Sequence, residues 1–251
     1  MPILRLLIAT AVFLAPAFGS TLFLVVPNGA ASSTGNSTDS VGGGPFDIEY
    51  QQDFGRGQFA SVPGSLLITQ FSFRSAPGTG AISVTDTSFS IYLSTSPFAP
   101  NSNFGNTLIT STFANNLGSD NTLVLSGGPG TLFSSPGCAG PGPCPFDMVF
   151  TLTTPFLYNP NNGFLLADFQ IHGFTGVGTG AFDAADFSAV SGGGFVASVS
   201  GALGSATGSV HLSGDITQLG YTLVTPEPAS YALVLFGLGA LAAFRRRKSA
   251  R

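Results

Sequence analysis

The sequence predicts an all-β protein: an antiparallel, jelly-roll-like β-sandwich flanked by an N-terminal signal peptide and one C-terminal transmembrane helix. Three observations in the 251 residues support this fold class. Apolar residues recur with period two from Phe46 onward, which places alternate side chains on opposite faces of a strand. Clusters of Gly, Pro, Asn and Ser separate these runs. Between the two ends, no run has the spacing of an amphipathic helix, so two packed sheets are the expected architecture.

Residues 1–19 have the pattern of a secretory signal peptide. Arg5 provides a positive charge, residues 6–14 form an apolar stretch, and Ala17-Phe18-Gly19 is a small-x-small cleavage site. Signal peptides of this kind are removed on export. We therefore expect residues 20–225 to form the exported body, a single domain long enough to bury a substantial core.

About nine or ten short strands are expected in the body. A first strand covers residues 22–26, and residues 30–44, a Ser/Thr/Gly/Asn tract without periodicity, are expected to form a loop. The later strands are expected at residues 46–51, 67–74, 88–93, 107–113, 121–125, 146–153, 164–171, 195–200 and 219–224. In each strand, one face should contact the core and the other should face water. Residues 173–214 hold few large apolar side chains, and we expect long loops or edge strands there.

Phenylalanine should supply most of the core. The chain has 24 Phe and no Trp, so Phe provides the large aromatic area. Burial of such area stabilises a fold by roughly 25 cal/mol per Å². The alternation places the following side chains inside: Phe71, Phe73, Phe89, Ile91, Phe150, Leu152, Leu166 and Phe169.

The expected body is acidic. It has two cations, Arg56 and Arg74, and eleven acids, so its net charge is −9, whereas the whole chain carries −4 because its ends are basic. A body of this charge repels phosphate backbones, and we expect no nucleic-acid binding. A body poor in charged residues and rich in Gly, Ser, Thr and Asn is typical of bacterial extracellular β proteins.

Cys138 and Cys144 are the two cysteines of the chain, in a loop rich in Gly and Pro. Outside the cytoplasm a disulfide is the default state of such a pair. Closing so short a loop stabilises a fold by roughly 2–2.5 kcal/mol. A redox or metal-binding pair is the alternative, but the nearest acid, Asp147, lies outside the loop beyond Pro145. We expect a structural disulfide.

The C-terminal end combines a Pro-rich motif, an apolar run and a basic tail. Residues 229–244 carry no formal charge, and a helix of that length covers roughly 24 Å, somewhat less than the roughly 30 Å hydrocarbon core of a bilayer. The flanking residues are Pro226, Glu227 and Pro228 before the run, and Arg245, Arg246, Arg247 and Lys248 after it. The positive-inside rule keeps these cations in the cytoplasm, which places the body across the membrane.

These three parts, in this order, resemble the PEP-CTERM sorting signal of Gram-negative bacteria, over residues 226–251 or about a tenth of the chain. The resemblance implies that Pro226, Glu227 and Pro228 are the recognition motif and that the basic residues form a retention tail. It also implies an exosortase, a membrane enzyme resembling cysteine proteases, that cuts near the tripeptide. An ordinary C-terminal anchor is the alternative, although a plain anchor has no need of this tripeptide. This type of signal is also named an ice-binding C-terminal domain, but that name is no evidence that this protein binds ice.

The sequence contains no recognisable catalytic set. It has no Gly-x-Ser-x-Gly motif, and His172 and His211 lie in strand-like runs where surface or rim positions are favoured over a triad. Asp47 and Glu49 share a strand face, as a glycosidase pair would, but a solvated face is the commoner explanation. Gly-x-Gly pieces open no helix, which disfavours a phosphate site. We therefore expect no enzyme activity and no cofactor.

Asp183 and Asp186 are weak candidates for a calcium site. They lie in a Gly-rich stretch, and their carboxylates together with loop carbonyls would suit Ca²⁺. The alternative is a pair of acidic loop residues that keep the surface soluble. Apart from these two residues, we predict no metal site.

The leading functional prediction is a non-enzymatic surface or extracellular-matrix protein. It would be exported by Sec, held in the inner membrane by its C-terminal helix, and sorted by an exosortase toward the exopolysaccharide-associated exterior. A glycan-binding module is the alternative, since jelly-roll sandwiches often bind sugars. The aromatic side chains then available for stacking are Tyr50, Tyr92, Tyr158 and Tyr221. A hydrolase is a third class, and it would require clustered polar groups.

Overall fold

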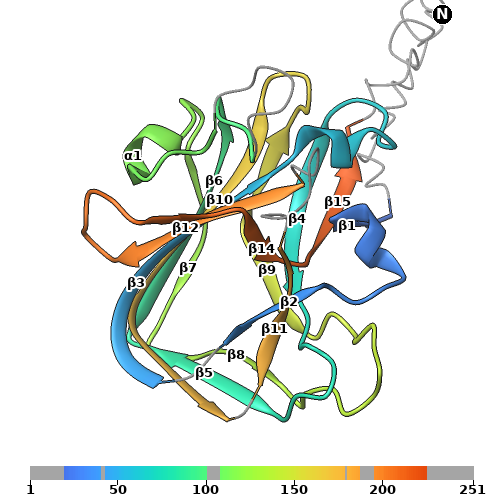
Figure 1. Ribbon diagram of the computed structural model, residues 1–251. Helices are drawn as coiled ribbons and strands as arrows, with labels where there is room; N and C mark the ends of the chain where they lie inside the picture. The colour runs from blue at the N-terminus through green and yellow to red at the C-terminus, as the bar shows by residue number, and fades with distance from the viewer. Residues whose placement is uncertain (1–19, 41–42, 101–107, 179, 187–194, 225–251) are drawn as a thin grey trace, which may run out of the picture.

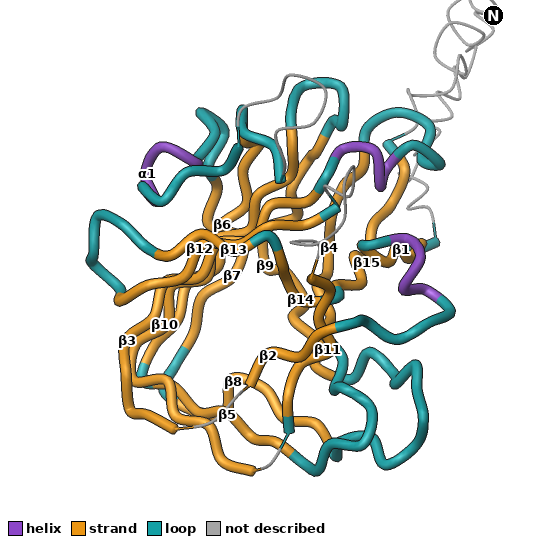
Figure 2. Tube along the Cα trace, viewed as in Figure 1, coloured by secondary structure: helices purple, strands orange, loops and turns teal. Residues whose placement is uncertain are grey.

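The computed structural model describes residues 20–40, 43–100, 108–178, 180–186 and 195–224 (Figure 1). The expected signal peptide, residues 1–19, and the expected sorting signal, residues 226–251, lie outside these described residues. The described part is mostly β-structure, arranged in several antiparallel sheets (Figure 2). The predicted all-β class is therefore correct for the body.

A four-stranded antiparallel sheet forms one side of the body. Its strands, in spatial order, are β1 (Leu22–Val26), β15 (Thr217–Leu223), β4 (Leu66–Phe73) and β9 (Met148–Tyr158). Strands β1 and β15 join the two ends of the described chain, because Leu22 pairs with Tyr221 and Val26 with Thr217. All four strands lie where the alternation predicts them, although β9 continues beyond the expected end at residue 153.

A larger sheet packs against the first through the core. Its path is β13 (Ser209–His211), β12 (Val196–Ala202), β3 (Gly43–Phe54), β10 (Phe164–Gly178), β5 (Ile82–Asp86) and β8 (Gly130–Ser135). β10 also pairs with β6 (Ser88–Ser96), which in turn pairs with β7 (Thr122–Gly127). Strand β10 is central: its first residues lie between β3 and β6, and its last residues, from Thr175, pair with β5.

A third sheet corrects the expected two-sheet sandwich. Strands β14 (Ser213–Asp215), β11 (Ala181–Asp186) and β2 (Ser37–Ser40) form a three-stranded antiparallel sheet. Strand β2 lies within residues 30–44, where the sequence predicts a loop. That prediction is wrong because a short, polar edge strand has no apolar alternation and forms only by pairing with β11.

Helical structure in the described residues is limited to single turns. These are two 3₁₀ turns, η1 (Asn28–Ala31) and η2 (Arg56–Phe59), and one α-helical turn, α1 (Phe113–Asn116). The strand predicted at residues 107–113 is therefore wrong. None of the helices in the described part is long and apolar enough to cross a membrane. The apolar run 229–244 lies outside that part.

Phenylalanine builds the core, as predicted. Phe73 of β4 contacts the rings of Phe150, Phe169 and Phe182, with centroids 6.0, 5.9 and 5.7 Å away. Seven of the eight residues predicted inside are buried, and the eighth, Phe89, is partly buried against the core. Tilted and edge-to-face contacts of this kind stabilise a core beyond simple area burial.

The large sheet is covered on both faces at β3, which corrects the expectation that one face of every strand contacts water. Glu49, Gln51 and Asp53 of β3 alternate with core-facing residues, yet all three are buried. The segment that carries α1 covers this outer face: Gln51 Nε2 donates to the Phe113 carbonyl (3.2 Å), and Asn116 Nδ2 donates to Gln51 Oε1 (2.9 Å). These tertiary contacts favour a helical turn where the local pattern predicts a strand.

A bulge in β4 shifts its alternation. Leu66 and Ile68 are buried before it, and Phe71 is buried after it. Ile68 and Gln70 pair with consecutive residues of β15, Tyr221 and Gly220, so Thr69 is the extra residue. The sequence predicts Leu67 on the same face as Phe71. This is wrong because the extra residue of the bulge reverses the faces.

Candidate functional site

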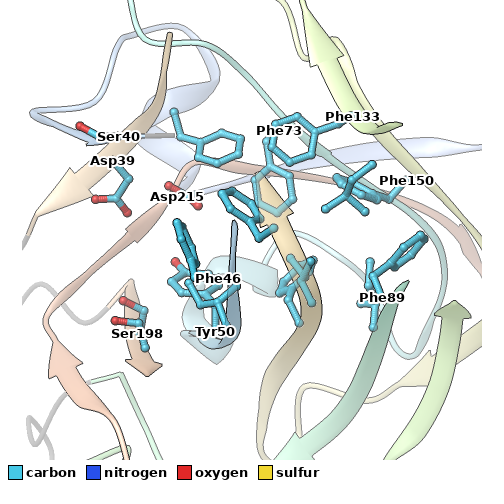
Figure 3. A pocket seen from close by; sticks show the side chains of 18 of the residues that line it. Asp39, Ser40, Phe46, Tyr50, Phe73, Phe89, Phe133, Phe150, Ser198 and Asp215 are labelled. Carbon is cyan, nitrogen blue, oxygen red and sulfur yellow. The ribbon is translucent and has the colours of Figure 1, made fainter. Parts of the chain in front are cut away.

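A cavity of about 330 Å³ lies between the three sheets (Figure 3). Its volume is within the range of small-molecule sites. Most of its wall is aromatic and comes from seven strands: Phe46, Phe73, Phe89, Phe133, Phe150, Phe169, Phe174 and Phe182. Ile48, Ile91, Leu132 and Ile171 complete the apolar lining.

The other end of the cavity is polar. Its lining residues are Asp39, Ser40, Tyr50, Ser198, Ser200, His211, Ser213 and Asp215. Serine and aspartate side chains are too short to fill the space between sheets, whereas Phe73, Phe133, Phe150 and Phe169 are buried at the opposite end. Ser40, Phe46 and His211 are exposed, so the cavity opens to solvent on this side.

Gln52 of β3 fixes the position of Asp215. Its Nε2 donates to the Asp215 carbonyl (2.9 Å) and to Thr217 Oγ1 (3.1 Å), and its Oε1 accepts from the Asp215 backbone N–H (2.8 Å). The Tyr50 hydroxyl also donates to Gln52 Oε1 (2.7 Å). Because Gln52 is buried, these bonds form in a low-dielectric setting and hold β14 firmly against the large sheet.

Asp39 and Asp215 form a carboxyl pair at the polar end (Figure 3). They lie on the two strands that flank β11, where Asp39 pairs with Phe182 and Asp215 with Ala184, so both occupy one face of the small sheet. Burial raises the pKa of Asp215 well above its usual range, and the charge of Asp39 and hydrogen bonding to it raise it further. Asp215 Oδ1 is buried and accepts no hydrogen bond from the described residues.

Sequence reasoning missed both members of this pair. Asp39 lies in the tract 30–44 that has no periodicity, and Asp215 lies in a weakly patterned segment. Only the pairing of β2 and β14 with β11 brings them to one site, and no local signal predicts that pairing. The wall was more accessible to prediction, since Phe46, Ile48 and Tyr50 alternate along β3.

A serine–histidine pair stands at the rim of the cavity. Ser200 Oγ and His211 Nε2 are 3.4 Å apart on the neighbouring strands β12 and β13. A triad also needs an acid that orients the histidine. Within the described part of the chain, no acid is hydrogen-bonded to His211. The other histidine, His172, is 55 % exposed and lies 3.5 Å from Asp47.

The carboxyl pair suggested by the sequence, Asp47 with Glu49, does not form. Asp47 accepts a hydrogen bond from the Gly173 N–H (2.8 Å), and this bond lowers its pKa. Glu49 instead lies near Asp168 of β10, and its burial together with the Asp168 charge raises the pKa of Glu49 to about 7. Burial also raises the pKa of Asp168 to about 6, although Gln170 Nε2 donates to it (2.9 Å). Both acids face away from the cavity.

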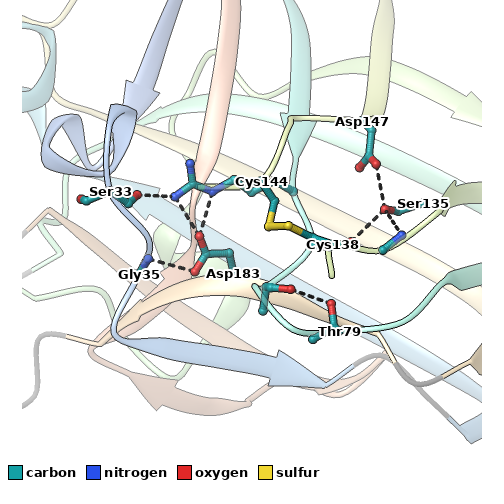
Figure 4. The surroundings of a disulfide bond; sticks show 12 residues. Ser33, Gly35, Thr79, Ser135, Cys138, Cys144, Asp147 and Asp183 are labelled. Atoms are coloured by element: carbon teal, nitrogen blue, oxygen red, sulfur yellow. Dashed lines mark hydrogen bonds and ion pairs between the residues drawn. A yellow bond between two sulfur atoms is a disulfide. The ribbon is translucent and has the colours of Figure 1, made fainter. Parts of the chain in front are cut away.

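Cys138 and Cys144 form a disulfide whose Cα atoms are 6.0 Å apart (Figure 4). The loop docks on the turn after β4: the Cys138 N–H donates to the Thr79 carbonyl (3.0 Å), and the Gly78 N–H donates to the Cys138 carbonyl (2.7 Å). The bridge therefore closes a loop within the segment between β8 and β9, and the two hydrogen bonds fasten that loop to the body.

Asp183, a calcium candidate from the sequence, is the partner of a buried arginine. Arg74 Nε and Nη2 each lie 2.8 Å from Asp183 Oδ2, and the Gly35 N–H donates to Oδ1 (2.9 Å, Figure 4). The backbone of Asp186 exchanges two hydrogen bonds with the Asn36 side chain. Among the residues that the structure describes, no group of three or more His, Cys, Asp or Glu is placed to hold a metal ion. Calcium binding stays a prediction, and the structure assigns Asp183 to an ion pair.

A mostly β body that ends before a Pro-rich motif, an apolar run and a basic tail defines a protein with a C-terminal sorting signal. Residues 224–248 match the PEP-CTERM protein-sorting motif, so the chain carries this motif at its C-terminus. The match contains the predicted recognition tripeptide and the four basic residues. It implies an exported protein that is sorted to the membrane and cell surface and processed by an exosortase. A search of curated proteins found none similar to this chain.

Proposed function

We propose that the protein is a non-enzymatic surface or extracellular-matrix protein associated with exopolysaccharide in a Gram-negative bacterium. In this proposal, Sec exports the chain by its signal peptide, residues 1–19. The C-terminal helix then holds it in the inner membrane until an exosortase cuts near Pro226, Glu227 and Pro228. The observation that carries the proposal is the sorting motif at residues 224–248.

The chemistry of the body supports an extracytoplasmic role. The Cys138–Cys144 disulfide suits an oxidising compartment. The two large antiparallel sheets pack face to face over the phenylalanine core, which fits a jelly-roll-like sandwich with the third sheet added at one side. Exposed acids such as Asp47 and Asp120 also favour solubility outside the cell.

The arrangement of polar groups favours a non-enzymatic role. Ser200 and His211 form only two parts of a triad within the described residues. Glu49 and Asp168 are both buried on the outer face of the large sheet, away from the cavity, where a polysaccharide chain has no access to them.

The positions of the four tyrosines considered for sugar stacking give little support to the glycan-binding alternative. Tyr158 and Tyr221 are buried, and Tyr50 lines the cavity with its hydroxyl bonded to Gln52, so none of the three forms an exposed platform for sugar stacking. Tyr92 of β6 is partly exposed, but one ring makes no platform. A matrix role is therefore the better supported of the two.

Substitution of the tripeptide tests the proposal. In cells, replacing Pro226, Glu227 and Pro228 with alanine should leave the chain in the inner membrane at its full length. Mass spectrometry should find the C-terminus of the native surface form near residue 226. The matched control is alanine at Asn161 and Asn162, two exposed residues of the β9–β10 turn, and its delivery should be unchanged. Unaltered surface delivery of the alanine variant would contradict sorting by this motif.

A further inference from the structure

The phenylalanine-lined cavity has two chemically distinct ends, and the proposed matrix role uses neither. The apolar end is formed by rings that are more than nine-tenths buried: Phe73, Phe133, Phe150 and Phe169. Asp39 and Asp215 stand at the other end (Figure 3), on the side where Ser40 and His211 are exposed to solvent. A concave apolar site with a few convergent polar groups is the usual form of a small-molecule site.

Asp215 offers an acceptor that the protein leaves unused. Its side chain is 7 % exposed and lines the cavity, and its Oδ1 accepts no hydrogen bond from the described residues. Buried polar atoms are nearly always hydrogen-bonded in folded proteins. The Gln52 bonds to the Asp215 backbone prevent β14 from moving to find a partner elsewhere. Because Asp215 lines the cavity, its Oδ1 is available to a donor that a ligand supplies.

The two carboxyls also lack a basic partner within the described residues. Arg56 and Arg74 are the cations of that part of the chain. Arg74 is bonded to Asp183, and Arg56 lies over the Phe164 ring, 5.5 Å from its centroid. His211 stands at the exposed rim. The polar end is thus complementary to a positive charge that comes from outside the protein.

We propose that the cavity binds a small amphipathic amine, whose ammonium group donates hydrogen bonds to Asp215 and Asp39 while its apolar body packs among the phenylalanines. A primary ammonium carries three donors and one positive charge, so it satisfies Asp215 Oδ1 and offsets the carboxyl pair. Aromatic ring faces attract cations as well. Phe46 and Phe174 pack together with centroids 5.1 Å apart and both line the cavity. A carboxylate ligand of the same shape would add a third negative group beside the pair.

Three isosteric ligands test the proposal by titration calorimetry at pH 8: 4-phenylbutylamine, 4-phenylbutanol and 4-phenylbutyrate. The full-length protein is used in lipid nanodiscs, and the heat from protein-free nanodiscs is subtracted. The amine should bind at least tenfold more tightly than the alcohol, and the carboxylate should not bind. Because the body of the ligand enters an apolar space, each added CH₂ should tighten binding about fourfold, which corresponds to about 0.8 kcal/mol.

Two variants test whether the ammonium group of the ligand binds at the two carboxyls. Asp215→Asn and Asp39→Asn should each weaken amine binding at least tenfold. Asp47→Asn removes one exposed carboxylate outside the cavity and should leave the affinity unchanged. If Asp215→Asn does not fold, the affinity of Asp39→Asn and the comparison of the three ligands still test the proposal. Equal affinity for the amine and the alcohol, unchanged binding by the two cavity variants, or no heat from any ligand at millimolar concentration would overturn the proposal. Surface delivery is measured separately, so it can fail without affecting this result.

Discussion

Replacing Asp168 with asparagine should stabilise the protein at neutral pH. Asp168 is 1 % exposed, and its burial raises its pKa from 3.8 to about 6. In the folded state the ionised carboxylate therefore carries a penalty that the unfolded chain avoids. The asparagine side chain would keep an oxygen that accepts from Gln170, and its amide can donate toward Glu49. The substitution thus removes the charge and retains the shape.

The size and the pH window follow from the two pKa values. Between pH 3.8 and about 6 the folded state binds more protons than the unfolded state, so the free energy of unfolding falls as pH rises through this window. About two pKa units correspond to about 3 kcal/mol, an upper limit that is reached above about pH 7. For a domain of this size, that gain would raise Tm by about 6–12 °C.

Urea unfolding of wild type and Asp168→Asn at a series of pH values provides the assay. The two proteins should have equal free energies of unfolding below about pH 4, and the variant should gain steadily up to about pH 7. Glu49→Gln should act in the same direction, since burial and the Asp168 charge raise the Glu49 pKa to about 7. A variant that is more stable by the same amount at every pH would show improved packing instead. A variant that is less stable at pH 8 would refute the reasoning.

Two further substitutions test the interactions that fasten the body. Arg74→Met should lower the free energy of unfolding by about 3–5 kcal/mol, because it leaves the buried Asp183 carboxylate unpaired; the exposed Arg56→Met, measured by the same urea titration, should cost less than about 1 kcal/mol. Replacing both Cys138 and Cys144 with serine should lower it by about 2 kcal/mol, and wild type treated with a reductant should match the double variant. A double variant as stable as wild type would show that the docking of the loop, and not the bridge, holds this segment.

Strands with large apolar residues on one face were predictable from sequence. Strands β4, β9, β10 and β15 each bury large apolar residues, and their period-two signal is visible without a structure although a bulge interrupts it in β4. The helical turn at Phe113 was not predictable, because the buried amides of Gln51 and Asn116 determine it through tertiary contacts.

For a related reason, local sequence patterns could not predict the third sheet or the polar end of the cavity. Strands β2 and β14 consist of Ser, Thr, Gly and Asp, which favour turns and loops when considered alone. Their backbone groups become satisfied only when β11 supplies partners. Strand β11 lies more than a hundred residues from β2 in the chain, so a windowed pattern does not contain this information.

The distribution of acids shows why composition alone overstates the exterior charge of this protein. The expected body holds eleven acids, but six of them are buried: Glu49, Asp53, Asp86, Asp168, Asp183 and Asp215. Burial raises the pKa of Asp53 and Asp215 well above the usual range, so burial disfavours a full negative charge on either side chain. The absence of nucleic-acid binding stays a prediction, and the scarcity of cations in the body also favours it. An ammonium group bound beside Asp215 favours the ionised carboxylate, and this attraction is strongest where the cavity excludes water and the dielectric is low.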